Sequence, residues 1–286
     1  MMIELKTEEQ FKERSRAEKE RCGKLVSNCL LPGRTVRDAL LRGRVLFREL
    51  PQGFVLYGAE GGHPPFYTLY YFLQPGAEMK GLAANLPVLL EEPDANDRRA
   101  AYLSELEPKL FRAGFTVIAK NILVEIAPES IAANDERYAA WQKAYEENGY
   151  RIAVDPCGKQ REEAFALWRA HLKPTDLPPG HFDPDAEGAH IVCILDRAGS
   201  VCGVNRWELK DGVCEIRHTV TRPDCLRQGI GSFLILYALQ DAEKKGMRSA
   251  FTYIDEQNVR SLAMYEKIGF RRTEKTCRQY LLPAAE

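Results

Sequence analysis

The sequence lacks a segment that could cross a membrane, because charged residues interrupt every apolar stretch before it reaches about 18 residues. Residues 1–24 are dense in Lys, Arg and Glu and have no apolar centre, so they do not form a signal peptide. An excess of one charge is also missing, since 40 basic and 41 acidic residues give a net charge of -1. Proteins that bind nucleic-acid backbones usually carry a strong basic excess. We therefore expect neither a membrane nor a nucleic acid as partner.

Metal-ligand motifs are absent too. The eight cysteines form no Cys-x-x-Cys pair, and the five histidines do not cluster with them at ligand spacing. Several cysteines lie inside apolar runs, which is typical of reduced, buried thiols in a cytoplasmic protein. The sequence therefore predicts no metal site and a cytoplasmic location.

The chain does contain enough apolar sequence for about two globular domains. It has 286 residues, of which 45% are apolar and 28% charged. We expect one domain over residues 1–127, a connecting helix within 128–149, and a second domain over 150–286. In the second domain, strands are predicted at 150–155, 191–195, 201–209, 213–221, 248–254 and 270–282, and helices at 160–171, 230–245 and 258–267. This order predicts an α/β (α+β) fold with a mixed sheet.

The first half is less regular. Strands are predicted at 54–57, 66–73, 87–91 and 115–126, and helices at 8–21, 35–41, 98–112 and 134–148. The aromatic run at 67–72 is expected to pack within a half-buried strand, although lining of an acceptor pocket is an alternative.

A weak internal repeat links the two halves. Residues 88–96 open a helix that ends at Gly114-Phe115, and residues 250–258 open one that ends at Gly269-Phe270. Duplication and chance similarity of two β-α units both explain this. Residues 74–86 are too short for a loop and a full helix, so a degenerate first copy is expected to bind no cofactor. It would line the acceptor cleft or make a dimer contact.

A glycine loop, Gln228-Gly-Ile-Gly231, stands between a predicted strand and a predicted helix. Glycines let a ligand approach the backbone closely, and the free N–H groups at a helix start favour phosphate. A plain tight turn is the simpler alternative. A dinucleotide-binding loop fits poorly, because Leu234 stands where that motif requires its third glycine.

Two motifs give the loop its context. Val220-Thr-Arg-Pro223 followed by Arg227-Gln-Gly-Ile-Gly231 resembles the central coenzyme A motif of the GNAT superfamily of N-acetyltransferases, and residues 258–270 resemble its second motif. The resemblance covers about residues 150–282. It implies a GNAT-like mixed central sheet flanked by helices, with acetyl-CoA as co-substrate. Leu226 departs from the family pattern, which has Gln or Arg there.

The resemblance also assigns cofactor-binding residues. The strand Thr219, Val220 and Thr221 would pair with the pantetheine arm, and the Thr219 N–H would be the oxyanion donor. The pyrophosphate would be held by Arg227, Gln228, Gly229, Ile230, Gly231 and Ser232. Asn258 would contact the lower arm of the cofactor.

Tyr265 occupies the position of the family's general acid. A phenol has a pKa of about 10, close to that expected of the departing thiolate, so proton donation is chemically reasonable. The alternative is a tyrosine that only packs a helix against the sheet.

Glu215 is the candidate general base, since a glutamate with similar spacing to the glycine loop has this role in the histone-acetyltransferase branch. A strand residue that faces solvent, or one that pairs with Arg217, is the alternative. A period of two places Glu215, Arg217 and Thr219 on one face. It places His218 on the other face, with Ile216 and Val220. We expect His218 to be a packed core residue.

The loop at 173–188 corresponds to the family's variable acceptor-covering region. Its Asp176, His181, Asp183 and Asp185 would either contact a cationic or polar acceptor or be solvated.

Taken together, the sequence predicts an acetyl-CoA-dependent N-acetyltransferase that acts on a small-molecule amine or a peptide, and a homodimer is compatible with it. Amino acids, polyamines, aminoglycosides and protein amines all stay open as acceptors. The first alternative is a non-catalytic acyl-CoA-binding sensor or interaction module. A nucleotide-binding protein that uses Gly229 and Gly231 ranks below both.

Overall fold

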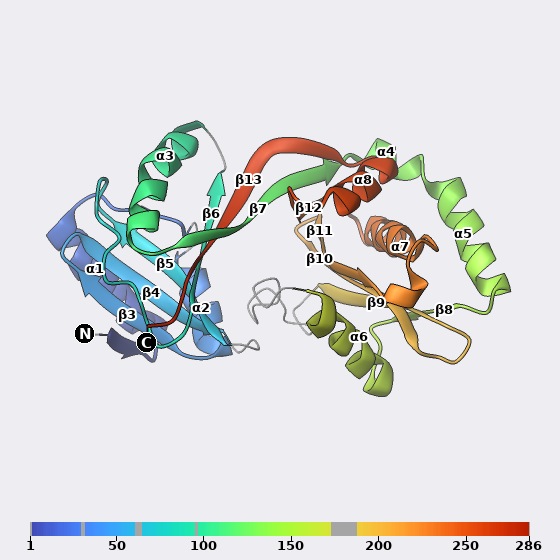
Figure 1. Cartoon of the computed structure of the whole chain (residues 1–286), viewed down its shortest axis with the longest axis horizontal. Coiled ribbons are helices and arrows are strands. Elements are labelled where there is room, and N and C mark those ends of the chain that lie inside the picture. Colours follow the sequence, from blue (N-terminus) through green and yellow to red (C-terminus); the bar gives the residue numbers. More distant parts are fainter. Residues whose placement is uncertain (1, 30–31, 61–64, 95–96, 173–187, 286) are drawn as a thin grey trace. The chain divides into compact units, whose positions relative to one another are not determined.

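The computed structural model describes residues 2–29, 32–60, 65–94, 97–172 and 188–285 (Figure 1). Its contacts divide the described residues into two compact units. The first takes those of 1–121 and 275–286, and the second takes those of 122–176 and 183–274. The connecting helix expected within 128–149 therefore belongs to the second unit, and residues 275–286 belong to the first.

The first unit is a mostly antiparallel sheet with helices. Its elements are β1 (Met2–Leu5), α1 (Glu8–Cys22), β2 (Val26–Ser27), α2 (Pro32–Arg42), β3 (Val45–Leu50), β4 (Gly53–Glu60), β5 (Phe66–Leu73), β6 (Val88–Asp94) and α3 (Asp97–Arg112), with part of β7 (Thr116–Ile126) and of β13 (Arg271–Leu282). The strands pair in the order β1-β3-β4-β5-β6-β13, and β2 pairs with β5. Only β5 and β6 run parallel within this order.

The connection from β5 to β6 holds no helix, as its length predicts. Instead, Met79 and Leu82 of this segment are buried in the core of the first unit. Tyr67, Tyr71 and Phe72 are also buried, which confirms that the aromatic run packs within the unit.

The second unit is a mixed sheet covered by helices. It contains α4 (Pro128–Ala132), α5 (Asp135–Glu147), β8 (Arg151–Val154), α6 (Gly158–His171), β9 (Ala189–Leu195), β10 (Val201–Lys210), β11 (Val213–Thr221), the short turn η2 (Pro223–Cys225), α7 (Ile230–Lys244), β12 (Ser249–Asp255) and α8 (Val259–Ile268). The order β7-β12-β11-β10-β9-β8 combines antiparallel pairs with the parallel pair β11–β12. The predicted mixed α/β sheet is confirmed.

Helices cover both faces of this sheet. Helix α7 packs on β9, β10 and β11, and α6 packs on β10 and β11 from the other face (Figure 1). Phe233, Leu234 and Ala238 of α7 are fully buried, as its apolar stripe predicts. The helices on both faces therefore hold β11 in place, and with it the loop that follows this strand.

A β-bulge interrupts β11 at His218 and Thr219. Val204 pairs with Val220 and Arg206 with Arg217, so two residues of β11 face the single residue Asn205 of β10. His218 takes a left-handed φ of 54°. Because of this extra residue, side chains after the bulge lie on the opposite face of the sheet from the one that simple alternation predicts.

The bulge corrects the predicted faces. Ile216 packs in the core with α7, and the side chain of Thr219 lies near Tyr265 of that same core, where it lowers the pKa of the phenol. Thr219 is thus on the face of Ile216 and not on the face of Glu215. His218 packs against Trp168 of α6, with ring centroids 6.4 Å apart. The histidine is packed as expected, but on the opposite face from Ile216.

Beside the bulge, β11 and β12 separate. Their parallel ladder covers only three pairs among the described residues, from Val213–Ser249 to Glu215–Phe251. Both strands nevertheless continue, to Thr221 and Asp255. The backbone of β11 after Glu215 consequently has an edge without a ladder partner on the β12 side.

Candidate active site

The glycine loop forms a concave stretch of backbone at the start of α7. Arg227 and Gly229 both adopt left-handed conformations, with φ of 65° and 78°. Gly229 is the N-cap of α7, and no described side chain caps this end through a hydrogen bond. Alternating backbone conformations of this kind turn successive N–H groups toward one point, where the helix dipole adds positive potential. The arrangement fits the pyrophosphate that the sequence predicts here.

The next loop residues are placed by packing. Ile230 is buried, and a Cβ at Gly231 would lie 3.3 Å from the Met264 sulfur and 3.4 Å from Thr221 Oγ1. Ser232 follows in the first turn of α7. Leu226, which replaces the family's polar residue, is 38% exposed.

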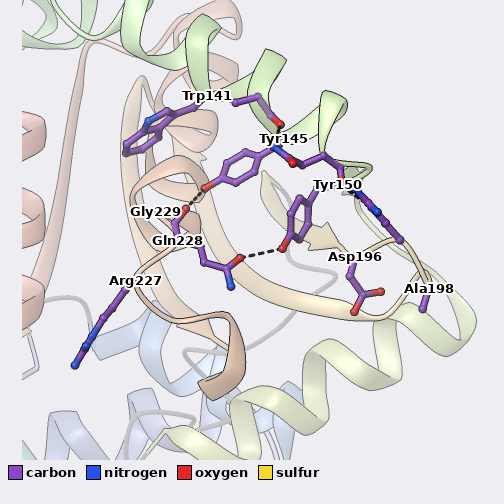
Figure 2. A pocket seen from close by; sticks show the side chains of 11 residues that line it. Trp141, Tyr145, Tyr150, Asp196, Ala198, Arg227, Gln228 and Gly229 are labelled. Atoms are coloured by element: carbon purple, nitrogen blue, oxygen red, sulfur yellow. Dashed lines mark hydrogen bonds between the residues drawn. The ribbon is translucent and has the colours of Figure 1, made fainter.

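A cavity of about 940 Å³ lies beside the loop (Figure 2). Its lining residues are Trp141, Ala144, Tyr145, Asn148, Tyr150, Asp196, Arg197, Ala198, Arg227, Gln228 and Gly229. The Arg227 side chain points away from the cluster of aromatic rings (Figure 2). Sequence reasoning missed the contribution of α5 to this cavity. The available signal was the pair Trp141 and Tyr145, whose i, i+4 spacing puts both rings on one face of a helix.

Tyr265 lies where β11 and β12 separate. Its side chain is 5% exposed, and its hydroxyl lies near the side chains of Thr219 of β11 and Thr252 of β12. Burial raises the pKa of this phenol to about 12, against the lowering effect of the two threonines. The ring packs edge-on against Phe270 at 4.9 Å. Tyr265 therefore has the packing role of the simpler alternative and also directs a protonated hydroxyl toward both strands.

Thr219 is fixed by a residue that sequence reasoning did not single out. Asn205, fully buried on β10, donates from Nδ2 to Thr219 Oγ1 at 2.6 Å. The indole of Trp168 donates to the His218 carbonyl, so the bulge is held from both faces. Neither contact can be predicted from the neighbouring sequence, because each joins residues from two different elements.

Glu215 lies on the other face of β11. Its carboxylate accepts a hydrogen bond from Arg217 Nη2 at 2.7 Å, and the two side chains are 21% and 25% exposed. Arg206, 1% exposed on β10, lies opposite Arg217 and pairs with Glu208. The geometry brings Glu215 together with its predicted partner Arg217, whereas Tyr265 contacts the opposite face.

Asn258 is the N-cap of α8. Its Oδ1 accepts a hydrogen bond from the Ser261 N–H at 3.1 Å, which leaves the Nδ2 group for other contacts. The predicted acceptor residues Asp176, His181, Asp183 and Asp185 lie outside the described residues.

Comparisons with known proteins agree with this geometry. A model of the Acetyltransferase (GNAT) family matches residues 136–270. A ribosomal protein bS18 alanine N-acetyltransferase of Escherichia coli K12 is 31% identical over 64 residues, covering 22% of this chain and 42% of that protein. The matched segment thus spans less than half of the curated relative.

Solved structures share the fold over most of the chain. A GCN5-related N-acetyltransferase from Kribbella flavida has 18% identity and a TM-score of 0.53, covering 88% of this chain and 93% of that one. A tandem GNAT protein from the clavulanic acid biosynthesis pathway has 11% identity and a TM-score of 0.57, covering 100% and 99%. No helix in the described parts of the chain is both long and apolar enough to span a membrane.

Proposed function

Because residues 136–270 form a domain of the GNAT acetyltransferase family, we propose that this protein transfers an acetyl group from acetyl-CoA to an amine of a small molecule or a peptide. The observation that carries the proposal is the place of Tyr265, whose buried phenol lies near Thr219 and Thr252 where the ladder between their strands has ended. A protonated phenol at the end of an unpaired strand edge is suited to acyl transfer.

The backbone supplies the proposed binding groups. The N–H groups at the start of α7, with Arg227 and Gly229 in left-handed conformations, would hold the pyrophosphate. The free edge of β11 beyond Glu215 would pair with the extended arm, and the Thr219 N–H would donate to the acyl oxygen. Asn258 would contact the lower arm of the cofactor through its Nδ2 group. When bound, acetyl-CoA would supply the acetyl group as a thioester open to attack by an amine.

Two side chains would move protons. Tyr265 keeps its proton at the phenol oxygen throughout the neutral range, since its pKa is about 12, and can donate it to the departing sulfur. Glu215, at the last pair of the β11–β12 ladder, would accept the proton of the attacking amine. Arg217 would orient that carboxylate through the 2.7 Å hydrogen bond.

Calorimetric titration with acetyl-CoA tests the cofactor step. We expect micromolar binding by the parent and none by Gly231→Trp, whose side chain would have to displace Met264 and Thr221. Gly43→Trp is the matched control, because Gly43 lacks a left-handed φ and a Cβ there would meet only the Ala59 carbonyl oxygen, at an ordinary contact distance of 3.6 Å. A folded parent that fails to bind acetyl-CoA would overturn the proposal.

Thiol release in the presence of amines tests the chemistry. The acceptor screen includes a peptide that begins with alanine, as the name of the bS18 relative suggests, together with amino acids, polyamines and aminoglycosides. Against the best acceptor, Tyr265→Phe should lower kcat by about 100-fold and leave the Kd of acetyl-CoA unchanged, since it removes only a proton donor.

The second candidate is a non-catalytic acyl-CoA-binding module. Leu226 favours it, because this exposed apolar side chain replaces a polar one that the family has beside the glycine loop. Tight binding of acetyl-CoA without thiol release for any amine class, and with Tyr265→Phe indistinguishable from the parent, would select this alternative.

A further inference from the structure

Two phenols hold the glycine loop from the side of α5. Tyr145, in the last turns of α5, donates to the backbone carbonyl of Gln228 at 2.7 Å. Tyr150, just before β8, donates to Oε1 of the same Gln228 at 2.9 Å. Figure 2 shows both hydroxyls converging on this residue from one side. The loop is thus fixed at its main chain and at its side chain by residues from a separate segment.

The first of these bonds sets the direction of the next N–H group. A trans peptide is planar, and its C=O and N–H point in opposite directions. Since the Gln228 carbonyl points at Tyr145, the N–H of Gly229 points away from α5. The Arg227 side chain also leads away from the aromatic rings (Figure 2). The hydrogen bond therefore directs a backbone donor to the side of the loop that is opposite α5.

Packing keeps the Tyr145 phenol in place. Its ring makes edge contacts with Phe233 of α7 at 4.9 Å and with Tyr150 at 5.5 Å. A Cβ at Gly229 would lie 3.3 Å from the phenol oxygen, so the loop approaches Tyr145 closely at a left-handed residue. Burial raises the pKa of Tyr145 to about 12, which keeps the hydroxyl a donor at neutral pH.

We propose that Tyr145 and Tyr150 are positioning residues for cofactor binding, which hold the Gln228–Gly229 peptide so that the Gly229 N–H faces the pyrophosphate of acetyl-CoA. The inference rests on the proposed function and extends its site to the helix α5. Neither phenol needs to touch the cofactor. Without the Tyr145 bond, this peptide can rotate, and the apparent Kd rises by the reciprocal of the fraction of molecules that keep the competent orientation.

The experiment measures acetyl-CoA binding by calorimetry for Tyr145→Phe, Tyr150→Phe and the double variant. Each substitution keeps the ring and removes only the donor. We expect Tyr145→Phe to raise the Kd by about 3- to 10-fold, the range of one neutral hydrogen bond. Tyr150→Phe, which acts only through the side chain, should have a smaller effect. Tyr138→Phe is the control, because Tyr138 stacks on the same Phe233 without a bond to the loop.

Labelling with [¹⁵N]glycine separates positioning from general loosening. In Tyr145→Phe, the amide signals of Gly229 and Gly231 should move, while those of distant glycines such as Gly53 and Gly114 stay unchanged. Parent-like affinity in Tyr145→Phe and in the double variant would refute the inference and leave the proposed function intact. Weakened binding with shifts of all glycine signals would refute it too, in favour of a structural role. Failure of the parent to bind acetyl-CoA would instead remove the proposed function.

Discussion

Tyr265 links the candidate chemistry to the stability of the fold. In the folded protein, burial raises its pKa to about 12, whereas an unfolded tyrosine titrates near pH ~10. The folded state thus favours the neutral phenol. This contribution is fully present below pH ~10 and is lost as the pH rises through ~12. We expect this one group to lower the free energy of unfolding by about 2–3 kcal/mol across that window.

Denaturant unfolding of the parent and of Tyr265→Phe at a series of alkaline pH values measures this effect. Tyr138 and Tyr145 also have pKa values raised to about 12, but the parent and Tyr265→Phe both retain these two tyrosines. The difference between the two curves therefore reports Tyr265 alone, and the free energy of unfolding of the parent should fall relative to that of Tyr265→Phe as the pH rises from ~10 to ~12. Parallel curves would show that the buried phenol is not held in its neutral form.

Asn205 shows at the level of one residue what the sequence could not predict. It follows an apolar run at the start of β10, and nothing nearby in the sequence indicates its partner. Its contact with Thr219 depends on the register between β10 and β11, which the bulge at His218 shifts. Local alternation therefore gives the wrong face for Thr219, although the same rule places Glu215 and Arg217 together correctly.

At the scale of an element, the start of α8 serves two separable purposes. The Oδ1 atom of Asn258 caps the helix, and its Nδ2 group is the part that remains for a cofactor. Asn258→Ala should lower the free energy of unfolding by about 1 kcal/mol, the usual value of an N-cap. Asn258→Asp keeps an acceptor oxygen and should stay near the parent.

Melting curves and acetyl-CoA titrations of these two variants separate the purposes. If the Nδ2 group contacts the cofactor, both variants bind acetyl-CoA more weakly, whereas only Asn258→Ala melts earlier. Parent-like binding by Asn258→Asp would restrict Asn258 to the cap.

Elements with a strong local pattern were predictable. The strands at 201–209 and 213–221 and the helix at 230–245 end within about one residue of β10, β11 and α7, because apolar periodicity and glycines mark their bounds. By contrast, β1 and β3 were not predicted. They are short, and they pair with each other across the intervening α1 and α2, so their stability comes from non-local contacts.

The same distinction applies to the candidate site. The glycine loop and Tyr265 belong to contiguous motifs, so the sequence indicates them directly. By contrast, the hydrogen bonds from Tyr145 and Tyr150 to Gln228 join positions that are 83 and 78 residues apart. An aromatic pair on one face of a helix indicates packing, but it does not name the segment against which the helix packs.

At the scale of the whole chain, thiol accessibility gives a test that does not depend on any ligand. All eight cysteines are free, and six are buried, as the sequence predicts. Burial raises the pKa of Cys193, Cys202 and Cys214 to about 12, so these thiols stay protonated and unreactive. Cys157 is exposed and Cys277 is half-buried.

Brief alkylation of the native protein should therefore label Cys157 first and Cys277 more slowly, with the other six labelled only after unfolding. Peptide mapping by mass spectrometry identifies the sites, and Cys157→Ser should abolish the fast phase. Fast labelling of a cysteine on β9, β10 or β11 would contradict the packing of the second unit.

The membership of residues 275–286 in the first unit has a consequence for synthesis of the protein. This segment carries the part of β13 that pairs with β6, and its Tyr280 and Leu282 are buried in the first unit's core. A ribosome that has released residues 1–121 has therefore not yet supplied the strand that completes that sheet. Until translation reaches these residues, the nascent first unit has an open strand edge and an unfilled core, and it can close only after the second unit has emerged.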